Sequence, residues 1–193
     1  MKFNRIAARF LGAMAVALLV VAAPLSAASA ETNILTVNTE QVFAQSKVGQ
    51  NLKSQVESAG KKLQADGQKA GDGLRAEAKK LGEQRGLLKE EDFAEKARAF
   101  QQKEQDTQRK FQKKEQDLQN GVNYARFQIQ KALSPLVGDV VKANGGGILL
   151  DKSAVIYGGK DVTLDLIKAL DGKMTTVKLT PMTQAELQKA AQQ

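Results

Sequence analysis

Two long amphipathic segments joined by a short connection constrain the fold of this chain more than any other feature. In residues 46–86, and again in residues 89–143, apolar side chains recur at steps of three, four, seven or eleven residues. Steps of this kind keep one seam of a helix turned toward a partner helix. Because the connection RGLLKEE is short, the two segments predict an antiparallel helical hairpin.

The ends of the two predicted helices carry typical signals. Ser46 suits the N-cap of the first helix, and Gly86 suits its stop. The second begins with the acidic run Glu90, Glu91 and Asp92, which complements a helix N-terminus. A helix of about forty residues reaches about 60 Å, so the hairpin is expected to project as an arm. Pro135 is expected either to kink the second helix or to end it.

Glycines interrupt the first helical segment although nearly all its other residues favour helix. Each glycine inside a helix costs about 1 kcal/mol relative to alanine. One hypothesis is that they make the arm a bendable strut beside a stiffer second helix. The alternative is that exposed helix positions tolerate glycine when packing supplies the stability. The six residues are Gly60, Gly67, Gly71, Gly73, Gly82 and Gly86.

The first thirty residues read as a secretory signal peptide. A basic start, an apolar run and the small-residue site Ala28-Ser29-Ala30 predict cleavage before Glu31 and export to the periplasm. An uncleaved anchor is the alternative, although the apolar run is shorter than the roughly 20 residues that span a bilayer. Of 29 basic residues, 26 remain after cleavage against 21 acidic ones, a net charge of +5. This balance favours acidic lipid surfaces or acidic polypeptides, and export argues against nucleic acid.

Composition removes most catalytic chemistry. The chain has neither cysteine nor histidine, so thiol nucleophiles, imidazole bases and the usual zinc sites are excluded. The glycine-rich stretches YGGKDV and GGG lack the spacing of a phosphate-binding loop and are interpreted as turns. We therefore expect no enzymatic activity, no cofactor, no metal and no ATP site.

A small β-rich body is predicted from residues 33–45 and 144–170. Its expected strands are Ile34–Val37, Ile148–Leu150 and Ala154–Tyr157, with Asn38 capping a helical turn and Asp161 or Thr163 capping a short helix. Three short strands cannot bury a sufficient core alone, so the body is expected to be completed by oligomerisation. The candidate oligomer residues are Ile34, Val37, Ile148, Leu150, Val155 and Tyr157.

The remaining candidate features are on the arm and the tail. Three lysine pairs are either a solvated face or a cationic lining that attracts an anionic client: Lys61 and Lys62, Lys79 and Lys80, and Lys113 and Lys114. Phe93, Phe100 and Phe111 are interpreted as hairpin core. Residues 171–193 are expected to be a loosely attached tail, with a capping box from Thr183 to Glu186.

Residues 33–170 resemble the Skp/OmpH-type periplasmic chaperone family. The resemblance is carried by ILTVNTEQVFAQSKVGQ at the start and by an LLD-x-x-x-V-x-Y pattern followed by D-V-T near the end. The second pattern lies at Leu149, Leu150, Asp151, Val155, Tyr157, Asp161, Val162 and Thr163. The glycine-rich first arm and the tail depart from the family pattern.

The resemblance implies an α+β fold, mainly α, in which a helical hairpin projects from a β-strand body. It further implies a homotrimer whose arms enclose a cavity for unfolded outer-membrane β-barrel proteins, held without ATP. A structural coiled-coil envelope protein that docks on one partner or on an anionic membrane surface is the alternative.

Overall fold

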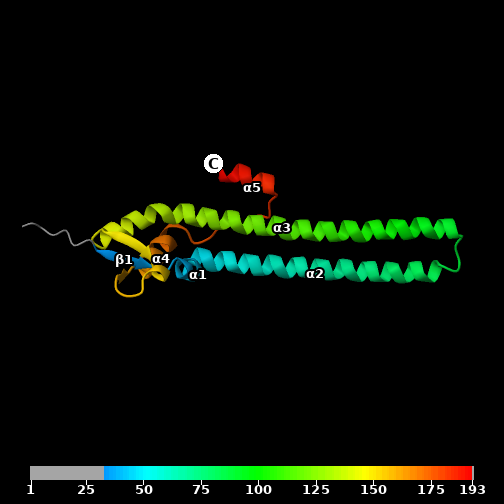
Figure 1. Cartoon of the computed structure of the whole chain (residues 1–193), viewed down its shortest axis with the longest axis horizontal. Coiled ribbons are helices and arrows are strands. Elements are labelled where there is room, and N and C mark those ends of the chain that lie inside the picture. The colour runs from blue at the N-terminus through cyan, green and yellow to red at the C-terminus, as the bar shows by residue number, and fades with distance from the viewer. Residues whose placement is uncertain (1–32, 193) are drawn as a thin grey trace, which may run out of the picture. The chain divides into compact units, whose positions relative to one another are not determined.

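The fold is dominated by a helical hairpin. The computed structural model describes residues 33–192, so the predicted signal peptide lies outside the described residues. Helix α2 (Lys47–Gln84) and helix α3 (Glu90–Ala143) run antiparallel and extend away from a small body (Figure 1). Ser46 caps α2, because its hydroxyl accepts a hydrogen bond from Gly49 N at 3.2 Å. These elements confirm the predicted hairpin.

The structure decides how α3 passes Pro135 and how α2 ends near Gly86. Helix α3 continues through Pro135, so the alternative in which a new helix starts there is wrong. Gly86 follows the end of α2, but it is not among the described glycines that have a positive φ. After α3, the chain turns through Gly145, Gly146 and Gly147, whose φ values of 94°, 71° and 109° favour glycine.

The body contains a three-stranded parallel sheet. Strand β1 (Ile34–Val37) lies between β2 (Ile148–Asp151) and β3 (Lys160–Asp161). In the register of β1 and β2, Ile34 is paired with Ile148. The whole hairpin therefore connects two neighbouring strands, so the arm starts and ends in the body.

The predicted strand Ala154–Tyr157 is wrong. The segment begins with a 3-10 turn, η1 (Lys152–Ala154), because the Asp151 carboxylate accepts a hydrogen bond from Ser153 N at 2.9 Å and bends the chain. Gly158 and Gly159 then adopt φ values of 88° and 83°, which are incompatible with a continuing strand. The third strand is β3 instead.

Two short helices cover the sheet and join it to the arm. Helix α1 (Thr39–Gln45) follows β1 directly and is capped by Asn38, whose side chain accepts from Gln41 N at 2.8 Å. Helix α4 (Thr163–Lys173) follows β3. The buried core is continuous from the sheet into the base of the hairpin and includes Leu35, Val37, Val42, Val48, Leu52, Ala125, Ile129, Leu133, Val140, Val162, Leu166, Ile167, Leu170 and Val177.

The C-terminal tail returns along the arm. Residues 174–183 form no regular secondary structure, and α5 (Gln184–Ala191) lies beside α3 (Figure 1). The predicted capping box is present, since Thr183 and Glu186 exchange hydrogen bonds. Val177 is only 5% exposed and contacts the core, whereas the other residues of 174–191 are partly or fully exposed.

Candidate functional site

On one face of the sheet three apolar side chains are exposed, whereas Thr36 on the same face is only 3% exposed. Ile34, Ile148 and Leu150 are 49%, 51% and 38% exposed, and the two-residue period of strands places them on the same face. Val37 points to the opposite face of the sheet and is buried in the core. Of the candidate oligomer residues in the strands, three therefore share an exposed surface and Val37 does not.

The loop after β2 adds to this exposed apolar surface. Ile156 and Tyr157 are 105% and 97% exposed, whereas Val155 is partly buried. Sequence reasoning missed Ile156 because it placed this segment in a strand, where Ile156 would alternate inward. Monomeric proteins rarely leave several large apolar side chains exposed in one small region. The exposed residues of the body therefore indicate a surface for association.

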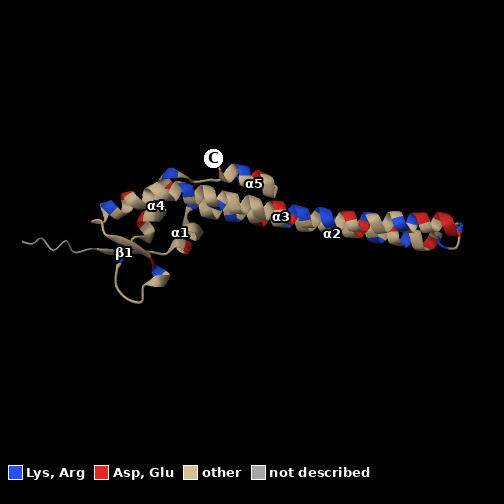
Figure 2. Cartoon of the chain, turned by 45° about the horizontal axis from the view of Figure 1, so that its top comes forward, with Lys and Arg blue, Asp and Glu red and all other residues tan. Residues whose placement is uncertain are grey.

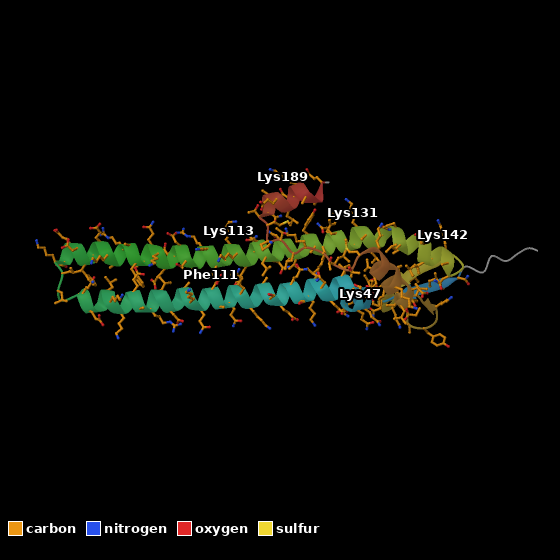
Figure 3. The ribbon with its side chains drawn as sticks, turned by 180° about the vertical axis from the view of Figure 1, so that it is seen from behind. Lys47, Phe111, Lys113, Lys131, Lys142 and Lys189 are labelled. Carbon is orange, nitrogen blue, oxygen red and sulfur yellow. The ribbon has the colours of Figure 1, made fainter. Side chains whose placement is uncertain are left out.

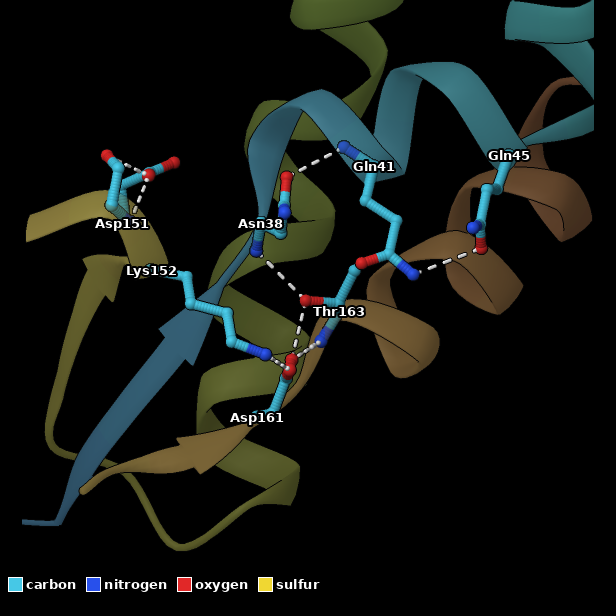
Figure 4. A network of polar contacts seen from close by, with 8 residues as sticks. Asn38, Gln41, Gln45, Asp151, Lys152, Asp161 and Thr163 are labelled. Carbon is cyan, nitrogen blue, oxygen red and sulfur yellow. Dashed lines mark hydrogen bonds and ion pairs between the residues drawn. The ribbon is translucent and has the colours of Figure 1, made fainter. Parts of the chain in front are cut away.

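A polar network fixes the chain where β1, β3 and α4 meet (Figure 4). Asp161 Oδ1 accepts hydrogen bonds from Thr163 N at 2.9 Å and from Thr163 Oγ1 at 2.5 Å, and Lys152 Nζ lies 2.8 Å from Asp161 Oδ2. Thr163 Oγ1 in turn accepts from Asn38 N at 2.9 Å. The D-V-T pattern thus joins the start of α4 to the end of β1.

The same network lowers the pKa values of two carboxyl groups. Hydrogen bonds from Lys152 and Thr163 lower the pKa of Asp161 to about 2. Hydrogen bonds from Ser153 and Thr39 hold the pKa of Asp151 well below its usual range. The hydrogen bonds that fix the loop therefore account for both lowered pKa values, and no catalytic role is needed to explain them.

The distal part of the hairpin is a thin two-helix ribbon. In the described chain, no residue between Val56 and Gln119 is buried, so the seam beyond the arm base is only partly covered. Phe111 of α3 lies between the two helices, and a Cβ added at Gly67 would be 3.7 Å from its ring (Figure 3). Phe93 and Phe100 are partly buried as well, as expected for hairpin core.

Charged residues of both signs are interspersed along the length of this ribbon (Figure 2). Lys114 lies 3.8 Å from Asp66 across the hairpin and 5.2 Å from the Phe111 ring. Lys113 is 3.1 Å from Asp117. The other four candidate lysines are exposed and form no ion pair within residues 33–192: Lys61, Lys62, Lys79 and Lys80.

Apolar hollows follow the inner part of the hairpin. One of about 350 Å³ lies between α1, α2 and α3, and its lining includes Phe43, Leu52, Val56, Val122 and Ile129. A second, of about 460 Å³, shares Val56 and Val122 with the first and continues to Leu63, Phe111 and Leu118. Together they form an open, mainly apolar surface along the arm.

The arm glycines are not required by close packing. A Cβ at Gly60, Gly73, Gly82 or Gly86 would meet nothing within 4 Å, and the nearest contact at Gly71 would be 3.9 Å. Alanine would therefore fit at all of these positions, as it would at Gly67. Crowding does not explain the glycines, so the explanation must lie in backbone freedom or in tolerance of glycine.

The described residues hold neither a candidate metal cluster nor a helix that could span a membrane. Within residues 33–192, no group of three or more acidic side chains is placed to hold a metal ion. In the same part of the chain, no helix is long and apolar enough to cross a membrane.

Comparison with known proteins agrees with the fold. The family model for outer membrane protein (OmpH-like) matches residues 33–170. A crystal structure from Caulobacter crescentus CB15, an OmpH-like protein named as a candidate outer membrane chaperone, superposes with a TM-score of 0.75 at 20% identity, covering 92% of this chain and 98% of that one. No curated protein matches the chain. The chain belongs to the OmpH-like family of outer membrane proteins.

Proposed function

We propose that this protein is an ATP-independent holdase chaperone of the periplasm. It binds unfolded outer-membrane β-barrel proteins in a cavity between helical arms and prevents their aggregation. Membership of the OmpH-like family supports a chaperone role. The observation that carries the proposal is the arm itself, a hairpin whose apolar seam stays partly exposed and is bordered by open apolar hollows.

The cavity requires more than one copy of the chain, and we propose a homotrimer. Ile34, Ile148 and Leu150 expose apolar side chains on one face of the sheet, and each outer strand pairs with β1 alone among the described residues. Exposed strand edges with apolar neighbours favour pairing with another chain. Burial of this face in a shared body would place several arms around a common space.

Client capture then depends on many weak contacts. The exposed lysines attract an anionic client, and this attraction weakens as salt screens it. The apolar hollows hold short apolar stretches without selecting one register of the client. A client that is bound in this way needs no nucleotide for release or retention, since affinity comes from reversible surface contacts.

The proposal is tested by diluting a urea-unfolded outer-membrane β-barrel protein into buffer without nucleotide and following its aggregation by light scattering. A stoichiometric amount of the chaperone should suppress the rise in scattering. The substitution of Lys61, Lys62, Lys79 and Lys80 by glutamine should slow capture at low salt and have little effect at high salt. Undiminished aggregation of the client would instead favour a structural protein that docks on a fixed partner or an anionic membrane surface.

A further inference from the structure

The tail is held on the arm through its main chain. Gln55 of α2 donates a hydrogen bond from Nε2 to Val177 O at 2.6 Å and accepts one from Leu179 N at 3.0 Å. Asn51, one turn earlier, accepts from Val177 N at 3.4 Å and from Gln55 Nε2 at 2.7 Å. These two amide side chains therefore pair with alternate residues of the tail, as a neighbouring β-strand would.

The contact continues onto α3 in the same manner. Asn120 Nδ2 donates to Met182 O at 3.1 Å, and Met182 N donates to Asp117 O at 2.9 Å. The tail also crosses Gly121 so closely that a Cβ there would lie 2.4 Å from Thr180 O. Nearly all of this recognition is directed at backbone groups, which every extended polypeptide presents.

Besides these bonds, the tail is retained by apolar packing at its start, where Val177 is buried and Met174 and Leu179 pack against the core. Of residues 174–191, Val177 alone is buried. Helix α5 has eight residues and buries none of them, and a helix of this length is marginal on its own. Segments with few buried contacts open locally at low cost in free energy. The tail is thus suited to leave the arm while the rest of the fold persists.

The surface on the arm that the tail contacts continues beyond the residues that the tail covers. At Pro181 a hollow of about 260 Å³ opens along the hairpin, with Ala59, Leu63 and Leu118 in its lining. Lys62 and Lys114, two of the candidate client-attracting lysines, line the same hollow together with Asp66 and Asp117. An extended chain that follows the path of the tail would therefore meet apolar side chains bordered by charges of both signs.

We propose that this surface binds extended segments of unfolded polypeptides and that residues 174–183 occupy it until such a segment displaces them. The proposal rests on the holdase function and assigns a binding surface to it. In this arrangement the tail shields the amide pair, Asn51 and Gln55, in the empty chaperone. A client segment replaces the bonds of the tail with equivalent backbone bonds.

The test compares Val177→Asp with Thr176→Asp in the full chain. Aspartate in place of buried Val177 should release the tail but leave Asn51, Gln55 and Gly121 unchanged. Aspartate in place of exposed Thr176 introduces the same charge and should leave the tail bound. The probe is a synthetic peptide with the sequence of residues 172–183. Val177→Asp should bind it at least tenfold more tightly than Thr176→Asp, and the addition of Gln55→Ala should remove that gain. Equal peptide affinity of the two aspartate variants would overturn the proposal.

A second measurement uses the unaltered chain and needs no released variant. Hydrogen exchange of the amides of Leu179 and Met182 is followed with and without a urea-diluted β-barrel client. Faster exchange in the complex is expected if the client displaces the tail, and unchanged exchange in a formed complex would refute displacement while leaving the holdase function intact. Peptide binding that depends on Gln55, in a protein that captures no β-barrel client, would keep the surface and reject the holdase function.

Discussion

The glycines of α2 permit a quantitative prediction about the stiffness of the arm. Replacement of five of the six glycines inside the helix, all except Gly49, introduces no steric conflict, because each added Cβ meets either open space or a contact of 3.7 Å or more. A substitution of this kind stabilises by about 0.4 to 1 kcal/mol per site. Five together should therefore raise the free energy of opening of the helix by about 2 to 5 kcal/mol. The variant carries Gly60→Ala, Gly67→Ala, Gly71→Ala, Gly73→Ala and Gly82→Ala.

Native-state hydrogen exchange measures this free energy along the arm itself. Since 1.4 kcal/mol is about a factor of ten, the α2 amides between Gly60 and Gly82 should exchange about 30-fold to several thousand-fold more slowly. Gly49→Ala is the matched control, because its Cβ would lie 1.6 Å from Phe43 O and should destabilise the junction of α1 and α2. Unchanged exchange in the five-site variant would refute the reasoning from helix propensity.

The same variant separates the two explanations of the glycines. If the arm must bend to fit clients of different size, the stiffened chaperone should capture large β-barrel clients less well than small ones. If exposed positions merely tolerate glycine, exchange should slow while capture of all clients stays the same. The second result would remove flexibility as the functional reason for these residues.

Other predictions concern the tail, the body and the arm surface. Gly121→Ala should detach the tail and raise its protease sensitivity, whereas Gly138→Ala, which meets nothing within 4 Å, should leave it bound. Because the pKa of Asp161 is lowered to about 2, its contribution to stability is present above about pH 4 and is lost as the pH falls toward 2. Thermal melts between pH 2 and 5 should show this loss, and Asp161→Asn should flatten it. Ile148→Lys should shift the assembly toward monomer in sedimentation, and an unchanged oligomer would contradict the role given to the exposed sheet face.

Local signals predicted most of the fold. Ser46 and Asn38 mark helix starts because each side chain accepts a hydrogen bond from a backbone N–H three residues later. The heptad steps predicted the hairpin because apolar residues repeated every seven positions stay on one side of a helix and pack against a second helix. Alternation along β1 places Val37 with buried Leu35, but Thr36, on the face of exposed Ile34, is buried as well, so alternation alone does not predict the burial of this strand.

The features that the sequence did not reveal depend on tertiary contacts or on competing local bonds. Residues 154–157 have strand-like composition, but the Asp151 side chain turns the chain before a strand can start. The tail is held by bonds between Gln55 and residues more than 120 positions away. Glutamine amides that pair with a distant backbone leave no periodic pattern in the sequence, so neither the docking of the tail nor the role of Gln55 could be predicted.

The most direct test of the account is light scattering coupled to size exclusion on residues 31–193, alone and mixed with a urea-diluted outer-membrane β-barrel protein, without nucleotide. We predict a trimer that elutes with the client as one soluble complex. A trimer that leaves the client to precipitate would contradict the holdase function and keep the fold. A monomer would contradict the assignment of the exposed sheet face to oligomerisation.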